Sequence, residues 1–115
     1  MDKDATVPIG HILEAIANIA ADIAGHDFES FRNDRRARQL VERNLEIVSE
    51  ASRRLPDALK RNEPDIPWKA IAGIGNVLRH DYHQSYPTVL WETCRKDLEP
   101  LKSAVQRIQN TLTQA

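Results

Sequence analysis

The sequence predicts an all-α fold: a single domain, residues 1–115, built as an up-and-down bundle of four main helices with short helical turns between them. Apolar residues recur every three or four positions through several long stretches, which is the period of one helix face. Proline and glycine residues stand near the ends of these stretches, where they start and stop helices. No stretch alternates apolar and polar residues as a strand does. Together these patterns indicate a helical bundle.

The composition is that of a folded chain with one core. Of its 115 residues, 41% are hydrophobic and 29% are charged, which is ordinary for a globular domain. The net charge of −1 means that any contact with RNA or DNA must come from a local patch or a partner. The single cysteine, Cys94, excludes an internal disulfide and a cysteine-based zinc site. Because the sequence has no basic leader and no apolar run near the ~20 residues of a membrane span, we expect a cytoplasmic protein without membrane contact.

The first helix is expected from Val7-Pro8 to Gly25. Proline is favoured in a first helical turn, and glycine at a helix C-terminus. The apolar stripe of this helix consists of isoleucines at 3-4-3-4 spacing, namely Ile9, Ile12, Ile16, Ile19 and Ile23. Its polar side has no excess of basic residues, so the stripe should face the bundle core or a dimer seam and not a membrane surface.

An arginine-rich segment, residues 32–38, separates the first helix from the second. Just before it, Phe28 and Phe31 are expected to pack against the end of the bundle. The segment has four arginines in seven positions. It is either the solvated start of a helix capped by Asp34 or a patch for an RNA backbone. The first interpretation is favoured for a charge run of this kind, although phosphates also bind well at a helix N-terminus.

The second helix is expected from Ala37 to about Arg54. Its apolar face is formed by Leu40 or Val41, Leu45, Val48, Ala51 and Leu55. Pro56 then begins a looser region, and the prolines at 64 and 67 mark a clear break.

The third helix should begin near Pro67. Its buried face is formed by Trp68, Ile71, Ile74 and Leu78. Gly73 and Gly75 interrupt it, each at a cost of about 1 kcal/mol relative to alanine in a helix interior. Glycine at these positions suggests close backbone packing, against a second protomer or a ligand.

The fourth helix should begin at Pro87 and continue to the end of the chain. Its apolar positions are Leu90, Cys94, Leu98, Leu101, Val105, Ile108 and Leu112. Pro100 lies inside this pattern. Because proline removes a backbone hydrogen bond and clashes with the preceding turn, we expect a kink or a restart between Asp97 and Pro100.

Titratable residues cluster at the end of the third helix: Arg79, His80, Asp81, Tyr82 and His83. If the helix continues at about 100° per residue, Asn76, His80 and His83 form one stripe. A histidine beside a guanidinium offers a proton carrier and a charge stabiliser for phosphate chemistry. The alternative is a helix end that simply collects polar residues, with cations favourable at the negative end of the dipole. Two histidines and one aspartate are too few ligands for an ordinary zinc site, so no metal and no other cofactor is expected.

Several segments resemble, in the same order and over almost the whole chain, the HepT-like branch of the HEPN domains. They are residues 9–13 (IGHIL), 43–47 (RNLEI), 66–68 (IPW), 71–73 (IAG), 78–82 (LRHDY), 91–92 (WE) and 97–98 (DL). The resemblance implies a HEPN-like helical bundle that forms a homodimer. It also implies a ribonuclease toxin of a toxin–antitoxin pair, whose antitoxin is a minimal nucleotidyltransferase of the MntA type.

The family motif is an arginine, four to six residues, then His-x-Tyr. By position, the histidine of the ribonuclease site falls on His80, and the tyrosine to which the antitoxin attaches AMP falls on Tyr82. For Tyr82, the alternative is a half-buried aromatic residue that closes the bundle. Residues expected to support the site are Asn76, Asp81, His83, Arg43 and Glu46.

The motif arginine does not carry over, because its position holds Gly75. A backbone amide does not replace the bidentate charge of a guanidinium. Three interpretations remain open. Arg79 takes the role beside His80; an arginine of the second helix, Arg43 or Arg53, takes it; or this is an inactive or differently active branch.

Two classes of function follow. In the first, the chain is a metal-independent endoribonuclease in which His80 moves a proton at the ribose 2′-OH or the leaving oxygen, and an arginine offsets charge on the phosphate. A dimer would bring two such clusters together and explain how a nearly neutral chain holds RNA. In the second class, the chain is a non-catalytic module that docks a nucleotidyltransferase or a nucleotide. Gly75 favours the second class, whereas His80 and Tyr82 favour the first.

Overall fold

All the regular structure in the described part of the chain is helical. The computed structural model describes residues 5–80 and 86–114, without the side chains of residues 79 and 80. The helices are α1 (Thr6–Ile23), α2 (Phe28–Arg32), α3 (Arg35–Arg54), α4 (Asp57–Lys60), α5 (Trp68–Ala72), α6 (Ile74–His80), α7 (Tyr86–Lys96) and α8 (Leu98–Gln114). The predicted all-α class is therefore confirmed.

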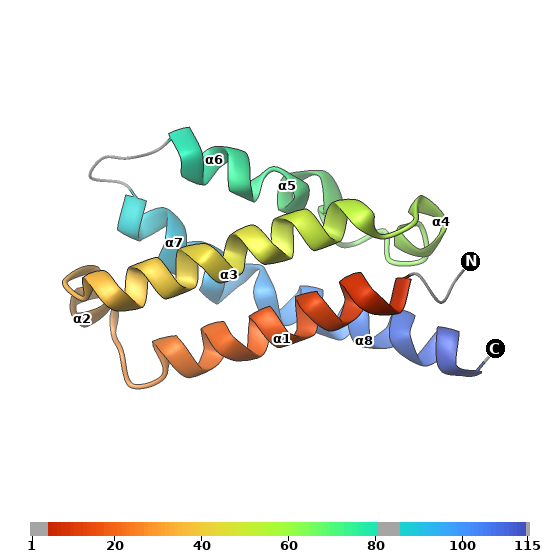
Figure 1. Cartoon of the computed structure of the whole chain (residues 1–115), viewed down its shortest axis with the longest axis horizontal. Coiled ribbons are helices and arrows are strands. Elements are labelled where there is room, and N and C mark those ends of the chain that lie inside the picture. Colours follow the sequence, from red (N-terminus) through yellow and green to blue (C-terminus); the bar gives the residue numbers. More distant parts are fainter. Residues whose placement is uncertain (1–4, 81–85, 115) are drawn as a thin grey trace.

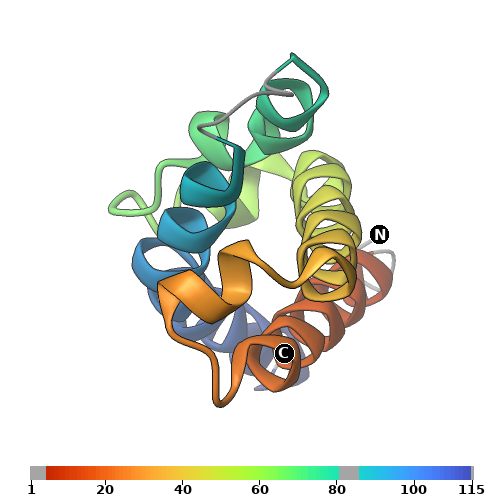
Figure 2. The ribbon, with the colours of Figure 1, turned by 90° about the vertical axis from the view of Figure 1, so that its left-hand side faces the viewer.

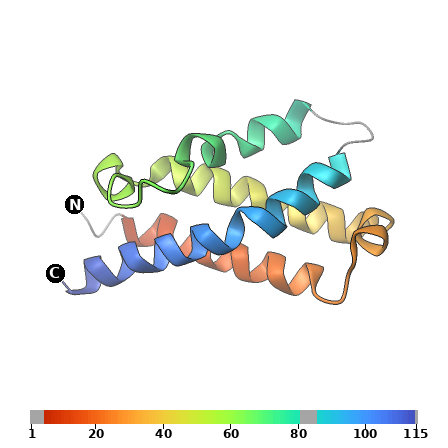
Figure 3. The same ribbon diagram turned by 180° about the vertical axis from the view of Figure 1, so that it is seen from behind.

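The helices form four rods that lie side by side and alternate in direction. The rods are α1, α3, the pair α5 and α6, and the pair α7 and α8 (Figures 1 and 3). The short helices α2 and α4 lie at opposite ends of the bundle. Seen end-on, the rods surround one common core (Figure 2), and α3 packs against α1, α2, α5, α6 and α7. This is the predicted up-and-down bundle of four main units with short helical turns.

Helix α1 has the predicted start, stripe and end. Pro8 lies in its first turn, and the isoleucines at 9, 12, 16 and 19 are buried while Ile23 is half-buried. Gly25 follows the helix with a φ of 82°. That left-handed conformation is strained for residues with a Cβ, so glycine is the residue that ends α1 most readily.

The arginine-rich segment begins α3 and is capped as predicted. The Asp34 carboxylate accepts a hydrogen bond from the Ala37 amide at 3.0 Å. Arg32, Arg35 and Arg36 are exposed. These features are those of a solvated helix start.

The connector before this segment forms the five-residue helix α2. Asp27 caps it reciprocally with Ser30, since each side chain accepts from the other residue's amide. Phe31 is fully buried and Phe28 half-buried, and both rings pack against Trp91 of α7, with centroids 5.2 and 6.2 Å away. The two phenylalanines thus close one end of the bundle as expected.

Helix α3 resolves the ambiguity between its two adjacent apolar residues. Val41 is fully buried, whereas Leu40 is 43% exposed. Adjacent helical residues point about 100° apart, so only one of the two can follow the stripe into the core. The remaining stripe residues, Leu45, Val48, Ala51 and Leu55, are all buried.

The third predicted helix is divided at Gly73, which lies between α5 and α6. Gly73 has no tight neighbour among the described residues of its own chain, and the expected contact with a second protomer or a ligand stays a prediction. A Cβ placed there would meet only the carbonyl oxygens of Lys69 and Ala70, at 3.5 Å each, which is ordinary contact within its own turn. Low helix propensity at Gly73 accounts for the break without a tight neighbour.

The fourth predicted helix restarts where its proline requires it. Helix α7 ends at Lys96 and α8 begins at Leu98, which puts Pro100 in the first turn of α8, where its missing N–H removes no intrahelical bond. Cys94 of α7 is buried, and burial raises the pKa of its thiol to about 12. Across the residues that the structure describes, no helix is both long enough and apolar enough to span a membrane.

Truncating Leu45 to alanine should lower the free energy of unfolding by about 2–5 kcal/mol, because its side chain is fully buried in the core. The matched control is Leu40→Ala, the same change on the same helix at an exposed position, for which we expect a change within about 0.5 kcal/mol. Urea unfolding followed by circular dichroism measures both. Equal losses in the two variants would contradict the assignment of the buried face of α3.

Candidate functional site

The predicted catalytic residues lie at the end of α6. Arg79 and His80 belong to the last turn of this helix, and their side chains lie outside the described part of the structure. Asn76, one turn earlier, is exposed. Asp81, Tyr82 and His83 lie outside the described residues. The expected stripe of Asn76, His80 and His83 therefore stays a prediction.

Ser49 of α3 holds the junction between α5 and α6. Its hydroxyl donates a hydrogen bond to the Ala72 carbonyl at 2.8 Å and accepts one from the Gly75 amide at 3.3 Å. Gly75 is buried at this contact. The backbone at position 75 is thus bound to α3 of the same chain.

Arg53 reaches the same junction from one turn further along α3. Its Nη1 donates to the Ala72 carbonyl at 2.7 Å and to the Ser49 hydroxyl at 3.2 Å. The cation lies against the C-terminus of α5, where carbonyl groups are left without helical partners. Both bonds use one nitrogen, and no carboxylate among the described residues forms an ion pair with Arg53. The exposed guanidinium therefore keeps donors for an anion beside Gly75.

Ser49, Arg53 and Gly75 line a small pocket of about 200 Å³ together with other residues that the sequence predicted for the site. Its lining comes from α3 and α6 and consists of Arg43, Glu46, Ile47, Ser49, Glu50, Arg53 and Gly75. The structure thus brings Arg43, Glu46 and Arg53 together beside Gly75. Ser49 and Glu50 were not among the residues that the sequence predicted for the site. A serine inside an otherwise apolar helix stripe was the available signal for Ser49.

The helix that follows the titratable cluster of residues 79–83 is also bound to α3. Tyr86, the first residue of α7, donates its hydroxyl hydrogen bond to the Glu42 carboxylate. Burial and this hydrogen bond raise the pKa of the Tyr86 phenol well above its usual value. Helix α6 also packs on α3, so both flanks of residues 81–85 are held by one helix. No group of three metal-ligating side chains occurs within residues 5–80 and 86–114.

Comparison with known proteins decides the family. The family model "Ribonuclease HepT-like" matches residues 12–108. The chain belongs to the HepT-like ribonuclease family. A relative from Thermococcus cleftensis named "Probable ribonuclease HepT" is 34% identical over 107 residues, which cover 93% of this chain and 94% of the relative.

A second relative of similar length comes from Caldanaerobacter subterraneus subsp. tengcongensis. It bears the name "Putative RNase TTE0752" and is 33% identical over 98 residues, or 85% of this chain and 88% of the relative. No solved structure matches the chain. The family assignment confirms the HepT-like ribonuclease part of the resemblance.

Replacing Ser49 with alanine should lower the free energy of unfolding by about 1–3 kcal/mol, because the buried Gly75 amide loses its acceptor. Amide hydrogen exchange at Gly75 should become faster. The matched control is Ser52→Ala, since Ser52 is equally buried but donates only to the Ser49 carbonyl within α3. If Ser52→Ala accelerates exchange at Gly75 as much as Ser49→Ala does, the Ser49 hydroxyl does not anchor α6.

Proposed function

We propose that this chain is the ribonuclease toxin of a toxin–antitoxin pair. It cleaves RNA without a metal, and a nucleotidyltransferase antitoxin neutralises it by transferring AMP to Tyr82. The observation that carries the proposal is membership of the HepT-like ribonuclease family, together with His80 and Tyr82 at motif spacing from the end of α6. Relatives that match over most of their length bear ribonuclease names.

In this mechanism His80 moves the proton. It takes the proton from a ribose 2′-OH, which then attacks the neighbouring phosphorus, or it protonates the oxygen that leaves. Charge that builds on the phosphate oxygens requires a fixed cation nearby. Positioned acid–base catalysis of this kind contributes about 10²–10⁴-fold to the rate.

Arg53 is the better supported source of that cation. Its guanidinium is bound beside Gly75, the position at which the family has its arginine. A planar guanidinium can bind two phosphate oxygens at once, which a backbone amide cannot do. Arg79, adjacent to His80, is the alternative donor.

A homodimer is part of the proposal. The chain has a net charge of −1, so a single copy attracts RNA weakly. Two copies with adjoining clusters double the local cationic field in one cleft. The cytoplasm is the compartment in which such an enzyme meets both RNA and its antitoxin.

Expression of the chain without a partner should slow growth, and His80→Ala should restore it and lower RNA cleavage by about 10²–10⁴-fold. Cleavage by purified protein is measured on labelled RNA with a chelator present. The circular dichroism spectrum of His80→Ala, compared with that of the wild-type chain, shows whether the loss of cleavage comes from disruption of the fold. A wild-type chain that binds a nucleotidyltransferase but neither slows growth nor cleaves RNA would establish the non-catalytic alternative.

The same assay distinguishes the arginines. If Arg53 supplies the cation, Arg53→Ala lowers cleavage strongly, Arg53→Lys restores it only in part, and Arg79→Ala has a small effect. The melting temperature of each variant separates loss of the Ala72 contact from loss of catalysis. The opposite order, with Arg79→Ala as the inactive variant, would assign the role to Arg79.

The antitoxin should modify Tyr82 and leave Tyr86 unmodified. The chain has two tyrosines, and the Tyr86 phenol is bound to Glu42 with a raised pKa, so it is a poor nucleophile. AMP on Tyr82 would add a bulky anion where RNA phosphates must enter. After co-expression with a nucleotidyltransferase antitoxin, intact mass should show AMP additions that disappear in Tyr82→Phe and persist in Tyr86→Phe. An unmodified Tyr82 in a neutralised complex would contradict this part of the proposal.

A further inference from the structure

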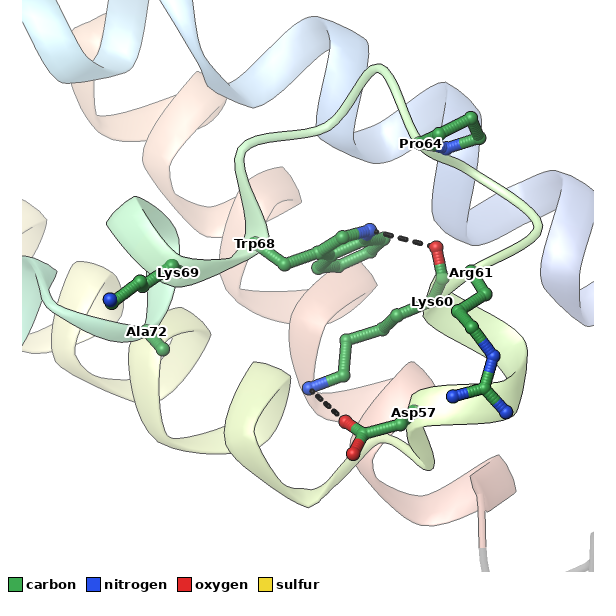
Figure 4. A pocket seen from close by; sticks show the side chains of 7 residues that line it. All are labelled: Asp57, Lys60, Arg61, Pro64, Trp68, Lys69 and Ala72. Atoms are coloured by element: carbon green, nitrogen blue, oxygen red, sulfur yellow. Dashed lines mark hydrogen bonds and ion pairs between the residues drawn. The ribbon is translucent and has the colours of Figure 1, made fainter.

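A second pocket, of about 550 Å³, opens between α4 and α5 (Figure 4). Its volume is in the range of about 300–1,000 Å³ that is typical of small-ligand sites. An indole, Trp68, lies in its wall, and three cationic residues also line the pocket: Lys60, Arg61 and Lys69. In Figure 4, Arg61 and Lys69 lie on opposite sides of Trp68. Among the described residues of the lining, Asp57 alone has a carboxylate, so this part of the lining is positive although the whole chain is slightly negative.

The indole is a fixed platform. Its Nε1 donates to the carbonyls of both Lys60 and Glu63, at 3.1 Å each. The Glu63 carboxylate is in turn held by Arg107 of α8, with Nη2 to Oε1 at 2.7 Å and Nε to Oε2 at 3.0 Å. These bonds tie the segment between α4 and α5 to the bundle. A planar ligand that stacks on Trp68 therefore meets a ring that is already ordered.

The cations differ in what they already bind. Lys60 is occupied, since its Nζ lies 3.7 Å from the Asp57 carboxylate and donates to the Ser52 carbonyl at 3.2 Å. Arg61 and Lys69 are exposed, and neither forms an ion pair within the part of the chain that the structure describes. Two cations of the lining, Arg61 and Lys69, are thus available to an anionic ligand.

This pocket adjoins the candidate site. The Ala72 side chain helps to line it, while the Ala72 carbonyl accepts the hydrogen bond from Arg53, which lines the smaller pocket with Gly75. The two pockets therefore lie on either side of the end of α5. Helix α6 continues from there to His80.

We propose that the Trp68 pocket binds single-stranded RNA, with one base stacked on the indole and the phosphates on either side of that base held by Arg61 and Lys69. Single-stranded nucleic acid presents a π-face and a negative charge in every unit, which are the two features that this lining complements. The inference rests on the proposed ribonuclease function. One part of the RNA strand lies at His80, and a neighbouring part of the same strand binds in the Trp68 pocket. The pocket gives a nearly neutral chain a local site for RNA.

Binding is tested in a His80→Ala, Trp91→Phe protein, which does not cleave by the proposed mechanism and keeps Trp68 as its one tryptophan. A labelled single-stranded RNA oligonucleotide should quench Trp68 fluorescence over the same concentration range in which its anisotropy rises. The double variant Arg61→Ala, Lys69→Ala should bind about tenfold or more weakly. Loss of two phosphate contacts should also reduce the slope of log affinity against log salt by up to about 1.4.

The matched control removes the same two residue types elsewhere. Arg95 and Lys96 are exposed on α7, outside this pocket, and Arg95→Ala, Lys96→Ala should leave RNA affinity within about twofold. Equal weakening by the two double variants, RNA binding without quenching of Trp68, or equal quenching by AMP alone would overturn the proposal. An acidic peptide that displaces the RNA at equal concentration would also overturn it, in favour of a protein partner.

The experiments distinguish a failure of the RNA pocket from a failure of the proposed ribonuclease function. If the wild-type chain cleaves RNA but Arg61→Ala, Lys69→Ala leaves RNA affinity unchanged, the Trp68 pocket is not an RNA site and the ribonuclease function stands. Quenching and weakened binding as described, with no cleavage by the wild-type chain, support the RNA pocket and remove the catalytic function.

Discussion

Helix α3 is the element on which the rest of the structure depends. Its apolar stripe fills the core, and α1, α2, α5, α6 and α7 all pack on it. Its polar flank has a second task, because Glu42, Ser49 and Arg53 bind the first residue of α7 and the junction of α5 and α6. One helix thus positions both the core and the groups around the candidate site. A change in the orientation of α3 would move all of them together.

The sequence predicts the bundle well because its signals are local. The period of the isoleucines, the cap at Asp34 and the restart before Pro100 each depend on residues within a few positions of one another. Leu40 and Val41 show the limit of such reasoning: both fit an apolar stripe, and only the packing of α3 decides which is buried. Gly73 shows a related limit, since a glycine in a helix pattern fits a break of low helix propensity and a close contact equally well, and within the described chain it marks the break.

The site was less predictable because it is built from distant pairs. Ser49 and Gly75 are 26 positions apart, and Glu42 and Tyr86 are 44 apart. Sequence spacing does not relate the two members of either pair, which meet only when α6 and α7 pack on α3. The resemblance predicts roles for His80 and Tyr82, but the His80 side chain and Tyr82 lie outside the described part of the structure. At position 75, the backbone amide donates to the Ser49 hydroxyl, which also accepts from Arg53. Position 75 and the guanidinium of Arg53 therefore meet at one hydroxyl group.

The burial of Cys94 has a practical consequence. The chain has one cysteine, and burial in the core raises the pKa of its thiol to about 12. Since the thiolate is the form that reacts with oxidants and alkylating agents, the folded protein resists both at neutral pH. Alkylation of Cys94 then reports on opening of the bundle alone. Its rate therefore measures how a bound ligand or partner changes the frequency with which the core opens.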